Sequence, residues 1–294
     1  MKWLACKIDQ NLEINLSKIA TNVLIKKFNK QILKDRLNKE IKKISKLQNR
    51  IYAENSQSLL IILQGMDGSG KDSCIKHIMR GVNPQGVQVF SFKHPSIIEL
   101  EHDYLWRHSQ KLPEYGQITI FNRSHYENVL ISKVHPEIVL AERLPGIKSV
   151  TEINHDFWLK RYKQINYFEN TIIENGTQVL KIFLHISKNE QARRFIDRIE
   201  HKEKHWKFSS QDINERKFWN RYQEAYSNAF KYTSTKYAPW YIVPADNKLN
   251  CHLLISQIIA EKLKAMNPLF PPIVAEEKFS LERFSMVLHK EIKS

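Results

Sequence analysis

A short apolar run leads directly into a glycine-rich loop and then into a segment with a helical pattern. The run is residues 58–63, the loop is 65–71 (Gly-Met-Asp-Gly-Ser-Gly-Lys), and the helical segment is 72–79. Glycines let such a loop curl until its backbone N–H groups converge, and the start of a helix adds partial positive charge. The spacing G-x-x-x-x-G-K between a strand and a helix therefore predicts a loop that binds phosphate. The residues expected to contact phosphate are Gly68, Ser69, Gly70, Lys71, Asp72 and Ser73.

Further apolar runs alternate with helical patterns along the chain. The strand candidates lie at 87–92, 118–121, 179–184 and 240–243, and the main helix candidates at 151–174, 212–232 and 250–266. Strands that alternate with helices form parallel sheets with both faces covered. We therefore predict an α/β fold with three layers, α/β/α, around a parallel five-stranded sheet.

Helical extensions are predicted on both sides of this core. Between residues 31 and 52, apolar side chains recur at steps of three and four, which indicates a docking helix with a basic outer face. Pro268, Pro271 and Pro272 precede a second apolar stretch at 279–287. The expected units are an N-terminal helical extension at 1–55, a core at 56–266 and a C-terminal extension at 267–294.

The charge balance favours a polyanionic partner. Lys and Arg number 46 against 31 Asp and Glu, which gives a net charge of +15 at pH 7. Such an excess of positive charge attracts nucleic acid, an anionic membrane or a phosphate-rich substrate. The alternative is a lysine-rich surface with no specific partner. The three separated cysteines suit neither a disulfide framework nor a zinc site, and no apolar run approaches the roughly 20 residues of a membrane span. We expect a soluble, cytoplasmic protein with no membrane partner.

A carboxylate inside the loop indicates a divalent cation. Asp67 lies among amides that bind phosphate, where its charge would repel the substrate unless a cation lies between them. Asp72 follows Lys71 where such loops usually carry Ser or Thr, and Ser73 comes one position later. Asp67 is therefore the expected Mg²⁺ ligand, with capping of the loop as the alternative.

A second polar group follows the apolar run at 118–121. Most enzymes with this loop end the corresponding strand with Asp, which orders Mg²⁺, whereas this chain has Asn122 and then Arg123. Arg123 leaves the carboxyl end of the strand, where ligands bind in open α/β sheets, and its guanidinium suits a clamp on a transferred phosphate. Glu127 either supplies the missing carboxylate to the metal or forms a surface salt bridge.

A basic cluster between residues 193 and 207 is the third signal. Arg194 and Arg198 are four positions apart and so share one face of a helix. In kinases with such a loop, a mobile segment bearing arginines closes over the reacting phosphates. We predict this lid at about residues 190–217, where Lys204 and Lys207 also bind phosphate; a solvated helix is the alternative.

At these positions the chain resembles the family-2 polyphosphate kinases. The similar stretches occur in the family's order and extend from about residue 30 to residue 266. They are Leu-Gln-Gly-Met-Asp-Gly-Ser-Gly-Lys-Asp (63–72), Asn-Pro-Gln-Gly (83–86), Ser-Phe-Lys-His-Pro-Ser (91–96), His-Asp-Tyr-Leu-Trp-Arg (102–107), Phe-Asn-Arg-Ser-His-Tyr-Glu (121–127), Trp-Lys-Phe-Ser (206–209) and Ala-Pro-Trp-Tyr-Ile-Val-Pro-Ala-Asp (238–246).

The resemblance implies a P-loop kinase fold with a helical lid, and transfer of phosphate between inorganic polyphosphate and nucleotides. ADP would become ATP. Asn rather than Asp at position 122 is similar to the subgroup of the family that also converts AMP to ADP. Adenine nucleotides are the expected acceptors, with guanine nucleotides as a further option. The resemblance also implies dependence on Mg²⁺, with Mn²⁺ as an alternative ion, and a homo-oligomer, either dimer or tetramer.

The resemblance also implies roles for single residues. The implied catalytic residues are Asp67, Lys71, Asn122, Arg123, Arg194 and Arg198. Lys93 and Arg107 fall in segments implied to line a polyphosphate channel. Arg123 and Glu127 are implied at the nucleotide, and Asp67 and Glu127 at the metal.

Two other functions stay open from the residues. An ATP-dependent nucleotide kinase of the thymidylate-kinase type would also carry this loop and an arginine at the strand end. A basic nucleic-acid-binding NTPase would use the lysine-rich helix as its grip, but the sequence has no recognised nucleic-acid motif, so no nucleic acid is expected as a partner. The chain departs from the family pattern at two places that bear on the choice of acceptor. It has His125 where the pattern has Tyr or Trp, and Gly68-Ser69 where the pattern has Ala-Ala.

Overall fold

The computed structural model describes residues 6–23 and 29–293. Its strands are β1 (Cys6–Lys7), β2 (Ser58–Gly65), β3 (Val87–Ser91), β4 (Ile118–Asn122), β5 (Thr177–His185) and β6 (Trp240–Pro244). Its α-helices are α1 (Lys30–Glu54), α2 (Lys71–Ile78), α3 (Ile97–Leu100), α4 (Trp106–Ser109), α5 (Ile131–Val134), α6 (Glu137–Leu140), α7 (His155–Glu174), α8 (Lys188–Glu200), α9 (Ser210–Glu215), α10 (Trp219–Thr233), α11 (Lys248–Met266) and α12 (Ala275–Glu291).

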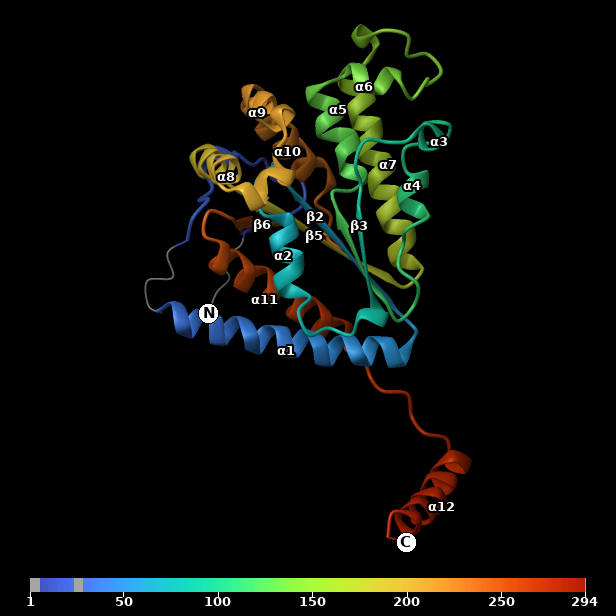
Figure 1. The fold of residues 1–294 in the computed structure, drawn as a ribbon. Coiled ribbons are helices and arrows are strands. Elements are labelled where there is room, and N and C mark those ends of the chain that lie inside the picture. The colour runs from blue at the N-terminus through green and yellow to red at the C-terminus, as the bar shows by residue number, and fades with distance from the viewer. Residues whose placement is uncertain (1–5, 24–28, 294) are drawn as a thin grey trace.

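The described strands form one sheet in the order β1-β6-β5-β2-β4-β3 (Figure 1). β2 to β6 run parallel to one another, so the predicted five-stranded parallel sheet is confirmed. The sixth strand, β1, pairs antiparallel with β6 and was not predicted. Because β1 has only two residues, it leaves no alternating pattern in the sequence.

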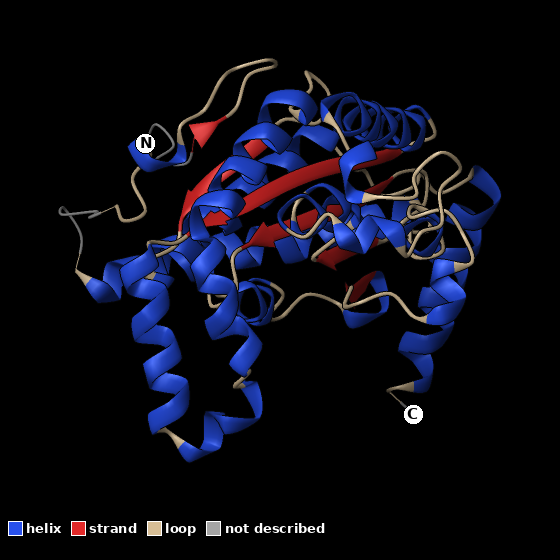
Figure 2. Cartoon of the chain, turned by 90° about the horizontal axis from the view of Figure 1, so that it is seen from above, coloured by secondary structure: helices blue, strands red, loops and turns tan. Residues whose placement is uncertain are grey.

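β2 lies at the centre of the sheet, and all eight of its residues are buried. Strands that are apolar on both faces are typical of parallel sheets between two layers of helices. α7 packs on β5 and on α10, whereas α11 packs on β5, β6 and α2. Figure 2 shows helices on both sides of the strands, which confirms the three-layer prediction.

α1 is the predicted N-terminal helix, and it packs along α11. It starts after Asn29, whose side chain accepts a hydrogen bond from the Ile32 N–H at 2.9 Å. Its apolar stripe includes Leu33, Leu37 and Ile41, which form a small buried cluster with a leucine of α11. The predicted docking role of this helix is therefore supported by its packing.

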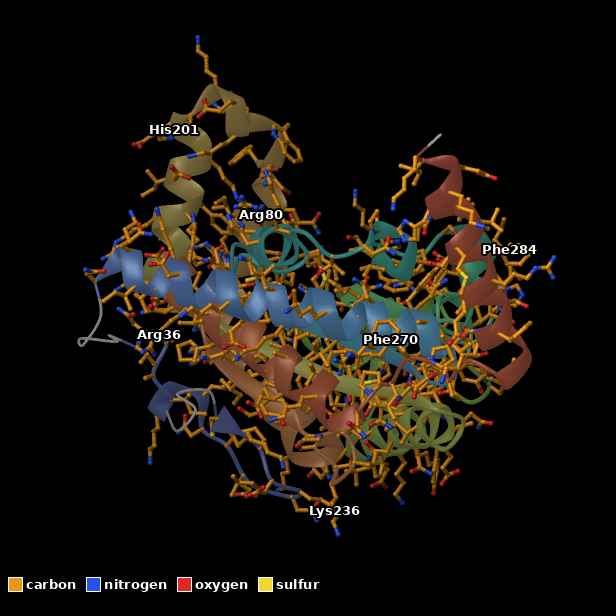
Figure 3. The ribbon with its side chains drawn as sticks, turned by 90° about the horizontal axis from the view of Figure 1, so that it is seen from below. Arg36, Arg80, His201, Lys236, Phe270 and Phe284 are labelled. Atoms are coloured by element: carbon orange, nitrogen blue, oxygen red, sulfur yellow. The ribbon has the colours of Figure 1, made fainter. Side chains whose placement is uncertain are left out.

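α12 stands apart from the body of the protein, at the end of the segment 267–274 (Figure 1). In Figure 3, Phe270 lies beside α1, where Arg50 is 5.9 Å from the centre of its ring, and Phe284 lies out on α12. Figure 3 also shows α8 projecting from the body, with His201 near its outer end. Within residues 6–23 and 29–293, none of the helices has the length and apolar content needed to cross a membrane.

Candidate active site

The glycine-rich loop joins β2 to α2, as predicted. Gly68 and Gly70 have φ angles of +76° and +101°, which side chains with a Cβ rarely adopt. A Cβ at Gly68 would also lie 3.1 Å from the Phe195 ring of α8. Glycine is thus needed here both for the turn of the backbone and for the close approach of α8.

Lys71 begins α2 and folds back under the loop. Its Nζ donates to the carbonyl oxygen of Gly65 at 2.6 Å and to that of Met66 at 3.4 Å. Burial, and after it the nearby Arg123 guanidinium, lowers the pKa of the Lys71 ammonium. Lys71 therefore lies at the floor of the loop, where such a lysine contacts phosphate.

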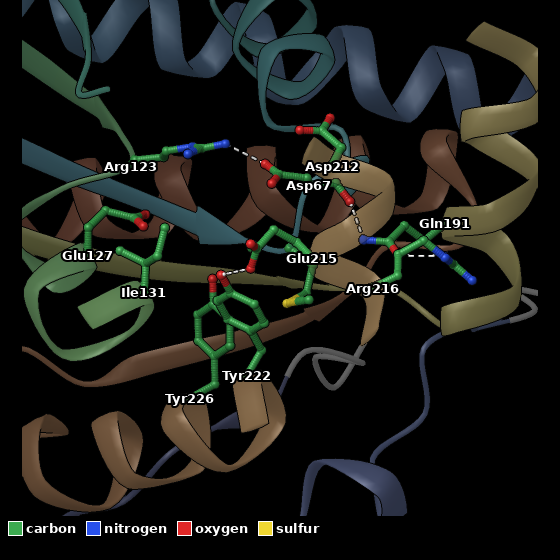
Figure 4. Close-up of a pocket in the computed structure, with 12 residues that line it drawn as sticks. Asp67, Arg123, Glu127, Ile131, Gln191, Asp212, Glu215, Arg216, Tyr222 and Tyr226 are labelled. Atoms are coloured by element: carbon green, nitrogen blue, oxygen red, sulfur yellow. Dashed lines mark hydrogen bonds and ion pairs between the residues drawn. The ribbon is translucent and has the colours of Figure 1, made fainter. Parts of the chain in front are cut away.

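Asp67 and Arg123 form an ion pair between the loop and the end of β4 (Figure 4). Arg123 has a φ of +63°, and its backbone N–H donates to the Leu63 carbonyl of β2 at 3.1 Å. Burial opposes the charge of Arg123, but Asp67 and Glu127 outweigh it and raise its pKa. The structure thus brings together the two motifs that the sequence predicted separately.

Glu127 lines the same small cavity, which has a volume of about 40 Å³. The side-chain amide of Gln64 is oriented so that both its nitrogen and its oxygen form hydrogen bonds. The nitrogen donates to Glu127 Oε1 at 3.0 Å, and the oxygen accepts from Ser124 Oγ at 3.1 Å. Burial, and then the charge of Asp67, raises the pKa of the Asp212 carboxyl, and burial raises that of Glu127. The charged residues that line the cavity are therefore four carboxylates and two arginines, and Arg198 pairs with one of the carboxylates, Asp212.

The carboxylates of this cavity fit a hard divalent cation. Among residues 6–23 and 29–293, no set of three or more His, Cys, Asp or Glu side chains is arranged to hold a metal. Mg²⁺, however, is commonly held by one or two carboxylates together with waters and substrate phosphates. Asp67 and Glu127 line one cavity and are the two carboxylates that would hold such an ion.

Asn122, Asp72 and Ser73 lie beside the loop rather than in it. Asn122 Nδ2 donates to Asp72 Oδ1 at 2.8 Å and to Ser91 Oγ at 3.1 Å, which ties α2 to the ends of β3 and β4. Ser73 Oγ lies 3.5 Å from His252 Nε2, on the side of α11. The Asp72 and Ser73 side chains thus contact other protein groups, and phosphate binding by the two residues stays a prediction.

Arg194 braces the loop from α8. Its Nη1 donates to the carbonyls of Gly68 (3.0 Å) and Ser69 (2.8 Å), and its Nη2 to those of Ala245 (2.6 Å) and Asp246 (3.1 Å). Its Nε donates to Glu190. A guanidinium engaged in this way holds the loop's shape, and the predicted contact of Arg194 with reacting phosphates stays a prediction.

The other basic residues of the predicted lid are placed at different distances from the cavity. Arg198 forms an ion pair with Asp212, which lines the cavity. Lys204 pairs with Asp197, and Lys207 lies over the ring of Trp206. Neither lysine lines the cavity, so their phosphate-binding role stays a prediction that would require movement of α8.

Several residues that line the cavity were not predicted. They come from α8, α9, α10 and the 3-10 turn at 216–218 between α9 and α10, and they are Gln191, Asp212, Glu215, Arg216, Tyr222 and Tyr226. Gln191 Nε2 donates to the Asp67 carbonyl at 2.7 Å, and Tyr222 Oη donates to Glu215 Oε2 at 2.7 Å. No motif marks these residues; the four-residue spacing of the two tyrosines gives only a shared helix face.

A larger cavity of about 300 Å³ opens beside Asp67, Arg123 and Glu127. Lys93 and Arg107 line it, and Arg107 Nη1 donates to the Lys93 carbonyl at 2.9 Å. The remaining charged residues of its lining are carboxylates: Glu99, Glu142, Asp212 and Glu215. The cations of its lining are Lys93, Arg107 and Arg123, and ion pairs with Arg161 and Arg198 hold Glu142 and Asp212.

The chain matches one protein family over most of its length. The model of the family described as polyphosphate kinase 2 matches residues 27–271. An ADP-polyphosphate phosphotransferase of Rhodopseudomonas palustris is 44% identical over 265 residues, which cover 90% of this chain and 91% of that protein. An AMP/ADP-polyphosphate phosphotransferase of Meiothermus ruber is 43% identical, over 82% of this chain and 85% of the relative.

A solved structure has a similar fold. The crystal structure of polyphosphate kinase 2 from Arthrobacter aurescens is 34% identical, covers 92% of this chain and 93% of its own, and gives a TM-score of 0.82.

Proposed function

Because this chain belongs to the polyphosphate kinase 2 family, we propose that it transfers phosphate from inorganic polyphosphate to ADP. The relatives at 44% and 43% identity are named for phosphate transfer between polyphosphate and ADP, or AMP and ADP. The chain is therefore a phosphotransferase, and AMP is its proposed second acceptor. Guanine nucleotides are a further option because the reacting groups contact phosphate rather than the base.

The observation that carries this proposal is the ion pair of Asp67 and Arg123, whose charges act on the nearby Lys71. A terminal oxygen of the acceptor phosphate attacks the terminal phosphorus of polyphosphate. A new P–O bond forms, the bridging P–O bond of the donor breaks, and polyphosphate leaves one unit shorter. The attacking oxygen is already anionic, so no general base is needed, and positioning and charge stabilisation carry the reaction.

Each residue of the site has a distinct proposed task. The loop amides and Lys71 bind the donor phosphate, and Arg123 clamps the phosphoryl group in transit. Asp67 and Glu127 would hold Mg²⁺, or Mn²⁺ in its place, together with substrate oxygens. When bound, the ion supplies positive charge to the transferred phosphate.

The larger cavity is the proposed place of the acceptor nucleotide. Its lining contains six carboxylates and three cations, and His102 and Tyr104 add rings. A nucleoside offers hydroxyl and amino donors to these carboxylates, whereas a polyphosphate chain offers them acceptors only. We therefore propose that Lys93 and Arg107, predicted to bind polyphosphate, face the acceptor's phosphates instead.

The test is product formation by the purified protein with Mg²⁺ and polyphosphate, with ADP and AMP supplied separately. ATP from ADP supports the proposal, and ADP from AMP supports the wider acceptor range. Product from ATP as donor, with none from polyphosphate, would replace the proposal with the ATP-dependent kinase. Removal of the metal with a chelator is expected to abolish activity, and added Mg²⁺ to restore it.

We further propose a cytoplasmic homo-oligomer, a dimer or a tetramer, that binds no nucleic acid. The mass of the particle in solution, measured by light scattering after gel filtration, decides between the two sizes; a monomer would contradict both. Retention of activity at saturating RNA would support the absence of a nucleic-acid partner.

A further inference from the structure

A cluster of polar side chains lies buried beneath the segment 123–127. Its centre is an ion pair in which Lys181 Nζ of β5 donates to Glu169 Oε2 of α7 at 2.6 Å. Neither side chain has any exposed surface. Removing two charges from water costs about as much as, or more than, their attraction returns, so stability alone does not account for such a pair.

The ion pair is bonded directly to the segment 123–127. Tyr126 Oη donates to Glu169 Oε1 at 2.8 Å and accepts from Lys181 Nζ at 3.0 Å. His125 Nε2 lies 3.4 Å from Glu169 Oε1. Both residues are fully buried, whereas Arg123 and Glu127, their neighbours in sequence, line the active-site cavity.

The backbone of this segment needs such a support. Arg123 has a φ of +63°, a conformation that costs of the order of 1–3 kcal/mol for a residue other than glycine and persists only where the surroundings fix it. The Tyr126 N–H donates to Ser124 Oγ at 3.2 Å, so a shift of Tyr126 would be passed to the residue next to Arg123.

The same cluster also contacts α10, the helix that lines the cavity with Tyr222 and Tyr226. Lys181 Nζ also donates to the Thr233 carbonyl, at 2.7 Å, at the end of α10. Thr233 Oγ1 accepts from Trp240 Nε1 of β6 at 3.0 Å. Because α10 carries Tyr222 and Tyr226, one buried lysine connects the two walls between which the substrates react.

We propose that the Glu169–Lys181 pair positions the segment 123–127 for phosphate transfer. Tyr126 is the positioning residue: its hydrogen bonds to the pair fix the backbone that carries Arg123 and Glu127. This inference rests on the proposed function. A displacement of reacting groups by about 1 Å can cost about 100-fold in rate, so a small loosening of the segment is enough to measure. Tyr126 acts through its neighbours and contacts no substrate.

The first test is Tyr126→Phe, which removes one hydroxyl and leaves the ring in place. The matched control is Ser58→Ala, which removes a buried hydroxyl 2.9 Å from Thr177 Oγ1 at the other end of β2. Tyr126→Phe is expected to lower kcat by about 10- to 100-fold and to change KM by less than about threefold, whereas Ser58→Ala keeps the wild-type kcat. A wild-type kcat for Tyr126→Phe overturns the inference.

The double variant Glu169→Leu with Lys181→Met removes both charges together and leaves neither unpaired. Replacement of a buried pair by apolar residues commonly preserves the fold, so the expected result is a folded protein with the same loss of kcat. A folded double variant with wild-type kcat contradicts the inference.

Hydrogen–deuterium exchange of peptides covering residues 122–130, without substrate, separates this inference from the proposed function. Exchange is expected to be faster in Tyr126→Phe than in the wild type and in Ser58→Ala. If the wild type forms no product from polyphosphate, the proposed function fails, and the exchange still decides the inference. Unchanged exchange in Tyr126→Phe overturns it, whatever the activity.

Discussion

Asp67 and Arg123 come from different parts of the chain, yet their side chains meet between the ends of β2 and β4. The sequence predicts each of them from its own motif, because a glycine-rich loop and the end of a parallel strand are local features. Their contact follows from the sheet: β2 and β4 are parallel neighbours, so their carboxyl ends share one edge.

Glu127→Gln tests the proposed metal site at the scale of one residue. The substitution keeps the shape of the side chain and its bond to Gln64 but removes a negative charge beside Asp67. We expect the Mg²⁺ concentration at half-maximal activity to rise about tenfold and kcat to fall about 100-fold. A Mg²⁺ titration of initial rates measures both, and a wild-type titration curve would rule out Glu127 as a ligand.

Lys93→Ala tests the place of the acceptor. Loss of one charged contact to phosphate is expected to raise the KM for ADP about tenfold, with the KM for polyphosphate unchanged. Lys111→Ala is the matched control, because Lys111 is exposed and does not line the larger cavity. A higher KM for polyphosphate alone would instead support the hypothesis that Lys93 lines a polyphosphate channel, as the sequence resemblance implied.

α8 shows what a sequence pattern leaves open at the scale of an element. The spacing of Arg194 and Arg198 indicates one helix face, and both lie on α8 as expected. Whether that face meets substrate or protein depends on how α8 packs against the loop, which is a long-range contact with no local signal. Arg194 meets four backbone carbonyls, whereas Arg198 reaches Asp212 beside the cavity.

Arg194→Met tests the supporting role of α8. The variant keeps an extended side chain but leaves the loop carbonyls without their donor, so the free energy of unfolding is expected to fall by about 3 kcal/mol. Urea denaturation measures this change. Arg193→Met, whose parent side chain is 75% exposed, is the control and is expected to lie within about 0.5 kcal/mol of the wild type. Equal stability of the two variants would contradict the bracing role.

Several of the buried histidines in the described residues have a pKa below the ordinary value. Burial, and after it the charge of neighbouring basic residues, lowers the pKa of His108 and lowers that of His252 to about 4. Burial also lowers the pKa of His125, and the carboxylate of Glu169 opposes this shift only in part. The unfolded chain binds a proton at each of them below its ordinary pKa of about 6.5, whereas the folded protein does not. The contribution of these buried histidines to the free energy of unfolding is therefore complete at neutral pH. It declines as the pH falls below about 6.5.

The free energy of unfolding is thus expected to be about 2–4 kcal/mol lower at pH 5.5 than at pH 7.5. Urea denaturation at the two pH values measures this difference. In His252→Gln, which cannot take up the proton, the difference is expected to be smaller by about 1 kcal/mol. Equal stability of the wild type at both pH values would show that these histidines are charged in the folded protein.

Lys71 and its loop are proposed to bind the phosphate that polyphosphate donates to ADP. The most direct measurement is ATP formation from ADP, Mg²⁺ and polyphosphate by the wild type, by Lys71→Ala and by Lys76→Ala, an exposed lysine on the same helix. The account predicts wild-type rates for Lys76→Ala and a loss of about 1,000-fold or more for a folded Lys71→Ala. Rapid ATP formation from polyphosphate by Lys71→Ala would contradict it.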